Sequence, residues 1–161
     1  MNAIEIKGLT KSYGGFRLDG LDLTLPSGCI MGLIGENGAG KSTVIKLILN
    51  LISRDGGTVN VLGCDNRKDM KLTKNDIGVV LDEVGFSGCL TARQVGKIMK
   101  QIYKNWDGTA FDGYIRRLGL PEDKQFKELS RGNKMKLGIA AAMSHGAKLL
   151  ILDEATSGLE P

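Results

Sequence analysis

The chain has 161 residues and a formal net charge of +4, and 42% of its residues are hydrophobic and 25% are charged. This length suggests one domain with a core of its own, and the composition is ordinary for a soluble globular protein. No stretch approaches the roughly eighteen consecutive apolar residues of a membrane-spanning helix, and the N-terminus lacks the long apolar core of a signal peptide. We therefore expect a cytosolic protein.

The cysteines and the basic residues suggest no special chemistry. Cys29, Cys64 and Cys89 are odd in number and form no CxxC pair, so we expect apolar fillers in place of disulfides or a zinc site. A nucleic-acid-binding protein would have its Lys and Arg concentrated on one face, whereas here they are spread along the chain. The one helical stripe of lysines, at 97–104, is best interpreted as a solvated face. Nucleic acid is not an expected partner.

The first elements are predicted to be strands. Ile4 and Ile6 alternate with polar residues, and so do Leu21, Leu23 and Leu25 before a Pro-Ser-Gly turn. This period of two is typical of strands with one buried face. We therefore predict that the chain begins with a β subdomain.

A phosphate-binding loop is predicted next. An apolar run at 30–34 leads into GENGAGKST at 35–43, and an apolar-periodic helix follows, so we expect a strand, a loop and a helix. The glycines let main-chain N–H groups approach phosphate oxygens and form an anion nest at the helix N-terminus. Lys41 would reach the β- and γ-phosphates, and the Ser42 hydroxyl would ligate Mg²⁺. The alternative is a glycine-rich turn before a helix, which the flanking elements disfavour.

The middle of the chain changes from strands to helices. Residues 58–63 and 77–81 are predicted strands, the second of them buried, and residues 91–128 are predicted to be mainly helical with Thr91 as a cap. Tyr103 and Trp106 have helical spacing and are interpreted as packing residues and not as a platform for bases. The pattern indicates an α/β core with a helical insertion.

The last third adds a capped helix and an acidic strand end. In LSRGNKMKL at 129–137, Ser130 is a good N-cap and Gly132 allows close approach to a ligand. The apolar run at 149–152 is typical of a strand buried on both faces, and Asp153 and Glu154 follow it. Asp153 is suited to hold Mg²⁺ through water, and Glu154 to polarise the water that attacks the γ-phosphate. A strand followed by an acidic turn is the alternative.

With these motifs in this order, the chain resembles the ATP-binding-cassette (ABC) family over residues 3–161. Residues 35–43 resemble the Walker A motif, 148–154 the Walker B motif, 129–133 the ABC signature and 157–161 the D-loop. The resemblance implies that Tyr13 stacks on adenine and that Glu154 is the catalytic base, with Lys41 as a second catalytic residue. The nucleotide-binding residues implied in this way are Tyr13, Gly35, Asn37, Gly38, Ala39, Gly40, Lys41, Ser42, Thr43, Ser130 and Gly132, and the metal ligands are Ser42, Asp82 and Asp153.

The same resemblance implies a fold and a set of partners. The expected fold is an α/β P-loop NTPase core with a mostly parallel sheet and flanking helices, an N-terminal antiparallel β subdomain and a helical insertion. Residues 1–161 would form the nucleotide-binding domain, with a helical subdomain at 87–128 that docks on a permease. Two cassettes would pair head to tail, as a homodimer or heterodimer, on the inner face of the membrane. The signature resembles most those of bacterial two-gene exporters for peptides or drugs.

The chain departs from the family pattern at several positions. Asp82 stands where the family has glutamine, which adds negative charge near the γ-phosphate. Arg131 and Asn133 replace small and amide residues of the signature, and Ala155 replaces proline. The switch histidine is absent, because His145 precedes the Walker B motif, and we expect a fragment of a longer cassette whose C-terminal strands are missing.

The predicted function is ATP binding and hydrolysis as the energising subunit of an ABC transporter, with Mg²⁺ as the cofactor. One alternative is a non-transport ABC ATPase that acts on nucleic acid or ribosomes. Such proteins usually carry two cassettes or long insertions, and this chain shows neither. The other alternative is a module that binds nucleotide without turning it over.

Overall fold

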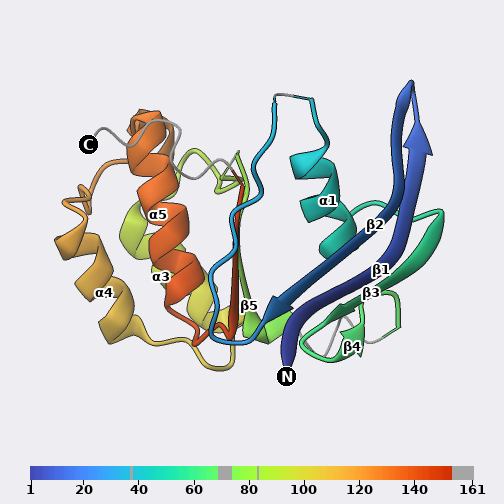
Figure 1. Cartoon of the computed structure of the whole chain (residues 1–161). Coiled ribbons are helices and arrows are strands. Elements are labelled where there is room, and N and C mark those ends of the chain that lie inside the picture. Colours follow the sequence, from blue (N-terminus) through green and yellow to red (C-terminus); the bar gives the residue numbers. More distant parts are fainter. Residues whose placement is uncertain (37, 69–73, 83, 154–161) are drawn as a thin grey trace. The chain divides into compact units, whose positions relative to one another are not determined.

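The computed structural model describes residues 1–36, 38–68, 74–82 and 84–153. The chain divides into two compact units, Met1–Lys74 and Asn75–Pro161, whose helices and strands are labelled in Figure 1. The similarity to P-loop ATPases is reported below with the other comparisons. The predicted helical subdomain at 87–128 stays a prediction.

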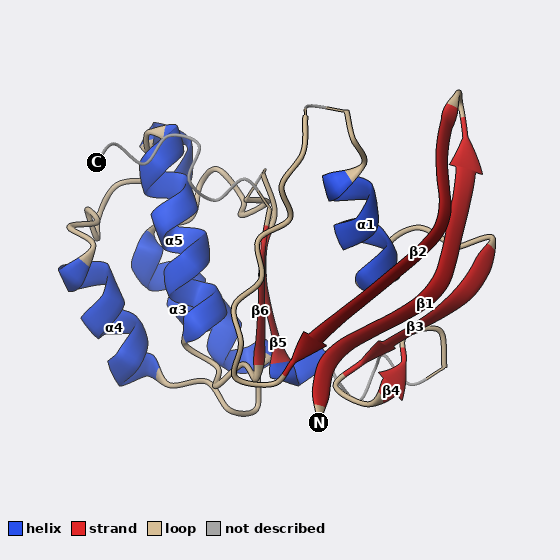
Figure 2. Ribbon diagram, in the orientation of Figure 1, coloured by secondary structure: helices blue, strands red, loops and turns tan. Residues whose placement is uncertain are grey.

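The first unit is built on a four-stranded antiparallel sheet (Figure 2). Its strands are β1 (Asn2–Tyr13), β2 (Phe16–Pro26), β3 (Gly56–Val61) and β4 (Cys64–Asp65), in the order β2-β1-β3-β4. The antiparallel N-terminal subdomain and the strand predicted at 58–63 are confirmed. The two-residue strand β4 was not predicted, because it is too short to show an alternating pattern.

The core of the first unit follows from the alternation in its strands. Ile4 lies opposite Val61 and Ile6 opposite Val59, and all four side chains are buried. Helix α1 (Lys41–Ile48) contacts β3 and also buries four apolar side chains. Burial of these side chains stabilises the unit, because their apolar surface is removed from water on folding.

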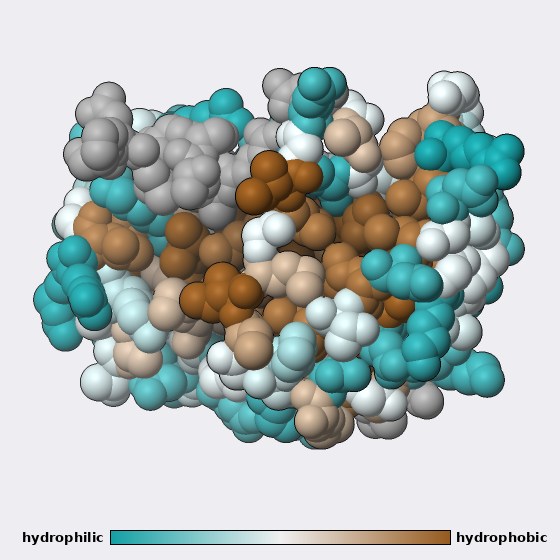
Figure 3. All heavy atoms as spheres, in the orientation of Figure 1, coloured by the Kyte–Doolittle hydropathy of each residue, from teal (hydrophilic) through white to brown (hydrophobic). Residues whose placement is uncertain are grey.

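The prediction of a strand just before the phosphate loop is wrong. Residues 29–36 have no regular secondary structure, and Ile30 and Ile34 are almost fully exposed. A strand needs a neighbour to pair its backbone groups, and within the described residues none pairs with this segment. Apolar side chains at the surface of the chain are shown in brown in Figure 3.

The second unit contains a two-stranded parallel sheet. Strands β5 (Ile77–Val80) and β6 (Leu149–Leu152) pair in register from Ile77 opposite Leu149 to Val80 opposite Leu152. Both strands were predicted, but the prediction that β6 is buried on both faces is wrong. Its side chains at 150 and 152 are about two-fifths exposed.

Three helices complete the second unit, and two of them begin at the predicted caps, Thr91 and Ser130. Helix α3 (Ala92–Ile102) begins with a capping box between Thr91 and Gln94. In helix α4 (Gly108–Arg117) the cap is Asp107, and in helix α5 (Arg131–Met143) it is the predicted Ser130. The helices share a buried cluster of Ala92, Val95, Phe111, Ile115, Leu120, Phe126, Leu129, Leu137, Ala140 and Ala141.

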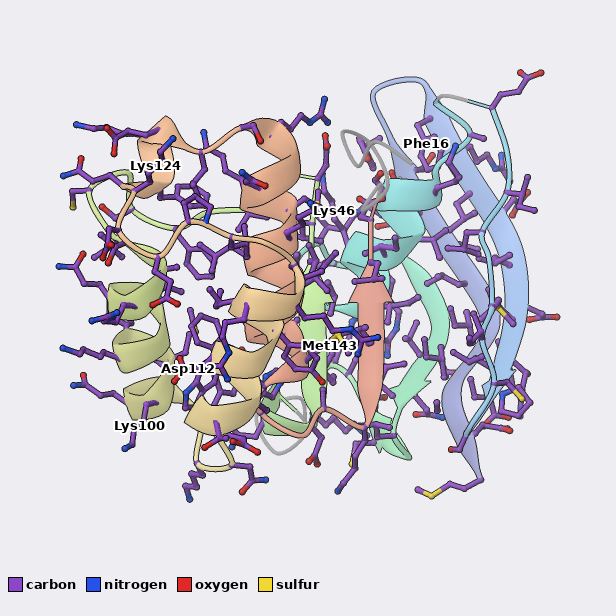
Figure 4. The ribbon with its side chains drawn as sticks, turned by 90° about the vertical axis from the view of Figure 1, so that its left-hand side faces the viewer. Phe16, Lys46, Lys100, Asp112, Lys124 and Met143 are labelled. Atoms are coloured by element: carbon purple, nitrogen blue, oxygen red, sulfur yellow. The ribbon has the colours of Figure 1, made fainter. Side chains whose placement is uncertain are left out.

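Two side-chain interpretations are confirmed and one is wrong. Tyr103 stacks on buried His145 with ring centroids 4.0 Å apart, and Trp106 lies against a phenylalanine of α4, so both aromatic residues are packing residues. The lysines of the stripe at 97–104 are exposed, Lys100 among them (Figure 4). All three cysteines are free, but Cys29 and Cys89 are exposed in loops and do not fill a core.

Candidate functional site

The phosphate-binding loop leads directly into α1 in the first unit. Gly40 is the N-cap of α1 and has a φ of 94°, a left-handed conformation that other residues rarely adopt. The first helical hydrogen bond runs from the amide of Val44 to the carbonyl of Gly40, at 2.9 Å. The amides of the first turn of a helix have no carbonyl four residues earlier to bond, and with the helix dipole they favour an anion at this end.

Lys41 lies folded over the loop. Its ammonium donates to the carbonyl of Gly35 at 2.7 Å and to the carbonyl of Glu36 at 2.9 Å. The amide of Ala39 also donates to the carbonyl of Glu36, at 3.1 Å. These bonds hold the lysine head group against the carbonyls of residues 35 and 36. Phosphate oxygens would attract the ammonium more strongly than neutral carbonyls do, because hydrogen bonds between charged partners are the stronger kind.

Tyr13 lies beside the first turn of α1. Its hydroxyl is 3.2 Å from the hydroxyl of Thr43, and its ring is about half exposed. The ring of Phe16 is 5.7 Å from that of Tyr13 and occupies the space where a Cβ on Gly40 would lie, 2.6 Å away. Figure 4 shows Phe16 at the start of β2, beside the first turn of α1. The exposed face of Tyr13 offers a flat apolar surface for a base.

In the second unit, the end of β5 and the start of α5 lie together. The Ser130 hydroxyl accepts from the amide of Asn133 at 3.2 Å and so caps the helix that carries Gly132. Asp82 follows β5, and its carboxylate accepts a hydrogen bond of 2.6 Å from the guanidinium of Arg131. The carboxylate predicted as a metal ligand is thus engaged by an arginine of the signature.

Asp153 follows directly on β6. It is buried, and its backbone amide donates to the carbonyl of Val80 at 2.8 Å, which extends the parallel ladder by one residue. The neighbouring Glu154 and the loop residue Asn37 lie outside the described residues. The predicted base and one predicted phosphate contact therefore stay predictions.

The predicted site residues fall into two groups, one in each unit. Tyr13, Gly40, Lys41 and Thr43 come together around the start of α1, while Asp82 and Ser130 lie near the start of α5. Sequence reasoning missed Phe16. The Gly14-Gly15 turn could have indicated this residue, because it places Phe16 directly opposite Tyr13 in the hairpin.

The residues proposed for a metal are oxygen donors. The hydroxyl of Ser42 and the carboxylate of Asp153 are the hard ligands that Mg²⁺ prefers, and this chemistry fits a site that needs one or two protein oxygens besides phosphate. Within the described ranges, no group of three or more His, Cys, Asp or Glu side chains could hold a metal by itself.

Comparison with known proteins identifies the family. The sequence model of the family described as "ABC transporter" matches residues 18–157. The chain belongs to the ABC transporter family. This match includes the Walker A loop, the signature and the Walker B strand, and it confirms the resemblance that these motifs indicated.

Several relatives of this ABC domain are export and resistance proteins. The chain is 35% identical over 161 residues to the bacitracin transport ATP-binding protein BcrA of Enterococcus faecalis, covering 98% of this chain and 52% of that protein. It is 38% identical over 168 residues to the daunorubicin/doxorubicin resistance ATP-binding protein DrrA of Streptomyces peucetius, covering 99% and 50%. The chain therefore spans about half the length of these curated relatives.

Solved structures give the same fold. The ATP-binding subunit of an ABC transporter matches with a TM-score of 0.87 and 25% identity, covering 99% of this chain and 69% of that one. A protein of Pyrococcus furiosus described as a putative ABC transporter (ATP-binding protein) matches with a TM-score of 0.82 and 21% identity, covering 98% and 78%, which shows the fold alone. The predicted P-loop ATPase fold is confirmed at this level.

Proposed function

We propose that this ABC domain binds ATP with Mg²⁺ and hydrolyses it. The observation that carries the proposal is the loop in which Lys41 bridges the carbonyls of Gly35 and Glu36 at the N-terminus of α1. An ammonium held by two loop carbonyls, at the N-terminus of a helix, would form a cradle for the β- and γ-phosphates. Tyr13 supports the base at the edge of that cradle.

The experiment is a titration of the chain with a fluorescent ATP analogue and Mg²⁺. Lys41→Ala removes the ammonium that would contact the phosphates, and we expect binding to be lost. Lys46→Ala is the matched control, because this lysine is exposed near the end of the same helix (Figure 4). Equal affinities for the two variants would refute the cradle.

Hydrolysis is assigned to the carboxylates after β6. A water molecule attacks the γ-phosphorus in line, the bond from that phosphorus to the bridging oxygen of ADP breaks, and Glu154 takes the proton from the water. Mg²⁺, held by Ser42 and Asp153, would neutralise charge on the phosphates. We expect Glu154→Gln to keep ATP binding and to stop phosphate release, and release at the parental rate would show that Glu154 is not the base. A parental chain that binds but releases no phosphate would be a binding module.

Head-to-tail pairing with a second cassette is the proposed working state. The capped start of α5, with Ser130 and Gly132, would close over ATP that is held by the phosphate loop of the other copy. We expect a Ser130→Ala variant to regain part of its ATPase activity when mixed with Lys41→Ala, since one of the two mixed sites is then intact. No gain on mixing would argue against pairing in trans.

A permease is the proposed membrane partner, which would place the protein at the inner face of the membrane. None of the helices in the described part of the chain combines the length and apolarity needed to cross a bilayer. The second unit has an apolar cavity of about 340 Å³ between β5 and α3, with Phe86, Met99 and Tyr103 in its lining. Such a cavity suits an apolar side chain from a partner helix. Where a permease is encoded beside the gene, we expect Met99→Glu, but not Lys100→Ala, to prevent co-purification with it.

The transported compound is proposed from the names of relatives. One relative is named a bacitracin transport protein and another a lantibiotic transport protein, of Streptococcus pyogenes. We propose export of a peptide or drug. Deletion of the gene should then sensitise the cell to such a compound, and unchanged sensitivity to a panel of peptide antibiotics and anthracyclines would contradict the assignment.

A further inference from the structure

The second unit carries a run of basic residues on and just after helix α3. Arg93, Lys97 and Lys100 are spaced by four and three positions, which places them along one side of the helix, and Lys104 follows two residues after its end. No aspartate or glutamate occurs between residues 84 and 106 of the sequence. We call Lys97, Lys100 and Lys104 the lysine group.

Acidic side chains around this helix act on Arg93, at its start. Arg93 donates a hydrogen bond of 3.0 Å to Glu122, which raises the pKa of the guanidinium, and the charges of Asp123 and Asp112 raise it further. The lysine group forms no ion pair with any residue that the structure describes. The carboxylate of Asp107, the next acid along the chain, caps α4. The uncompensated charge therefore lies toward the C-terminal end of α3.

The lysine group faces solvent from a helix that is fixed to its unit. Ala92, Val95 and Gly96 are buried, and a Cβ on Gly96 would lie 2.8 Å from the ring of Phe111 in α4. All three lysines are exposed, and Figure 4 shows Lys100 pointing away from the rest of the unit. A helical rise of about 1.5 Å per residue keeps them within roughly 10 Å along the axis, close to the Debye length at physiological salt. The three charges therefore act together on a nearby anionic surface.

The chemistry of the lysine group suits a broad layer of negative charge. A lysine ammonium is a hydrated point charge on a flexible stem, whereas an arginine guanidinium recognises a single carboxylate or phosphate through two hydrogen bonds. The apolar cavity of this unit is lined by Met99 and Tyr103, and none of its described lining residues is a lysine. The lysine group thus offers charge on a helix surface outside that cavity. The head groups of acidic phospholipids form a matching layer.

We propose that the lysine group binds acidic phospholipid head groups at the surface of the membrane. The choice of a bilayer rests on the proposed permease, because a domain that docks through the neighbouring cavity would lie beside the lipids. The contact is electrostatic and needs no insertion into the bilayer. Ile98 and Ile102, which are exposed, each lie two positions from Lys100 and so on another side of the helix.

The test is a titration of the chain with vesicles made of equal parts of phosphatidylcholine and phosphatidylglycerol, with vesicles of phosphatidylcholine alone as the reference. Trp106 is the only tryptophan and lies two residues after Lys104, so energy transfer to a dansyl-labelled head group reports binding. We expect the combined change of all three lysines to Gln to weaken binding about a hundredfold, which is about fivefold for each lysine. Added salt should release the parental chain.

A variant with the same loss of charge elsewhere in the unit provides the control. Arg116 and Arg117 lie in the last turn of α4 and Lys127 lies in the turn before α5, and all three side chains are exposed. Their combined change to Gln removes three positive charges without touching the lysine group, and we expect it to weaken binding by less than about threefold. Thermal unfolding checks that both variants are folded, with midpoints within a few degrees of the parental value.

Three results would overturn the inference. No binding to the acidic vesicles, or an equal loss in both variants, would mean that the lysine group is only a solvated surface. Binding that persists in high salt would mean that apolar side chains such as Ile98 insert into the bilayer. Lysine-dependent binding to polyglutamate, without binding to vesicles, would indicate an acidic protein partner.

The vesicle experiment is separable from the proposed function. The vesicles contain no permease and no nucleotide, so a failure to bind them leaves ATP binding and permease docking to their own tests. Loss of co-purification with a permease would, in turn, leave the vesicle titration unchanged.

Discussion

The hydroxyl of Tyr13 lies 3.2 Å from the hydroxyl of Thr43, which links the end of β1 to the first turn of α1. The ring that is proposed to hold the base is thereby fixed relative to the loop that is proposed to hold the phosphates. Since both ends of one nucleotide must be bound together, this hydrogen bond preorganises the site.

Replacement of Tyr13 should separate the role of the ring from that of the hydroxyl. We expect Tyr13→Ala to weaken binding of an ATP analogue by about 1–3 kcal/mol, the usual value for loss of a base stacked on an aromatic ring. Tyr13→Phe should cost much less, because it keeps the ring and loses one exposed hydrogen bond. A fluorescence titration measures the affinity of both variants for the analogue. Equal losses of affinity would show that stacking is not the main contribution of Tyr13 to binding.

Gly40 should tolerate no side chain. A Cβ there would lie 2.6 Å from the Phe16 ring, and the φ of 94° is strained for other residues. We expect Gly40→Ala to destabilise the first unit by about 1–3 kcal/mol and to weaken nucleotide binding. Phe16→Ala in the same chain should relieve only the steric part, so the double variant should recover partly in chemical denaturation. Full recovery would mean that backbone strain is negligible.

A buried amide should fix the end of α1. The Asn66 side chain donates to the carbonyls of Leu47 and Ile48, at 2.7 Å and 2.9 Å, and accepts from the buried guanidinium of Arg54. Asn66→Ala leaves these groups unpaired, and we expect a loss of about 2–4 kcal/mol in urea denaturation. The control is Asn50→Gly, because this residue is exposed and its φ of 53° suits glycine. Similar effects of both changes would contradict the role of the amide.

The stability of the first unit should fall in acid through Asp55. Hydrogen bonds from the Lys11 ammonium and from the Ser12 amide, at 2.9 Å and 2.7 Å, lower the pKa of this carboxyl below its ordinary value of 3.8. A lowered folded pKa contributes stability that is fully present above the unfolded pKa and is lost as the pH falls through the folded one.

We expect Asp55→Asn to lower the urea midpoint at pH 6 and to have a smaller effect at pH 2.5, where both chains lack the charge. Lys11→Met removes the largest cause of the lowered pKa of Asp55. It should therefore narrow the pH range over which the stability of the first unit changes. A constant difference between Asp55→Asn and the parental chain at every pH would contradict this account. Because the carboxyl is exposed, the effect should also decrease with added salt.

Local sequence signals predicted the helices well. The caps Thr91 and Ser130 and the glycine-rich loop act through residues within four positions of each other, so their spacing is enough to predict them. The alternation of Ile4 and Ile6 was enough for a strand for the same reason. Family resemblance added Tyr13, whose stacking on adenine stays a prediction and whose hydroxyl lies close to that of Thr43.

The failed predictions depend on distant parts of the chain. The apolar run that includes Ile30 and Ile34 has strand composition, but a strand forms only against a neighbour that supplies backbone partners. Burial of β6 on both faces likewise needs cover from another element. The contact between Asp82 and Arg131 joins positions far apart in sequence, and no pattern in either segment reveals it.

Free thiols offer a way to follow this domain at work. Cys29 in the first unit and Cys89 in the second are both exposed, whereas Cys64 is partly buried. After Cys64→Ser, a pair of spin labels or fluorophores on the two remaining sulfurs would act as a molecular ruler. A change in the signal from the two labels when ATP and Mg²⁺ are added would report nucleotide binding by the domain in real time.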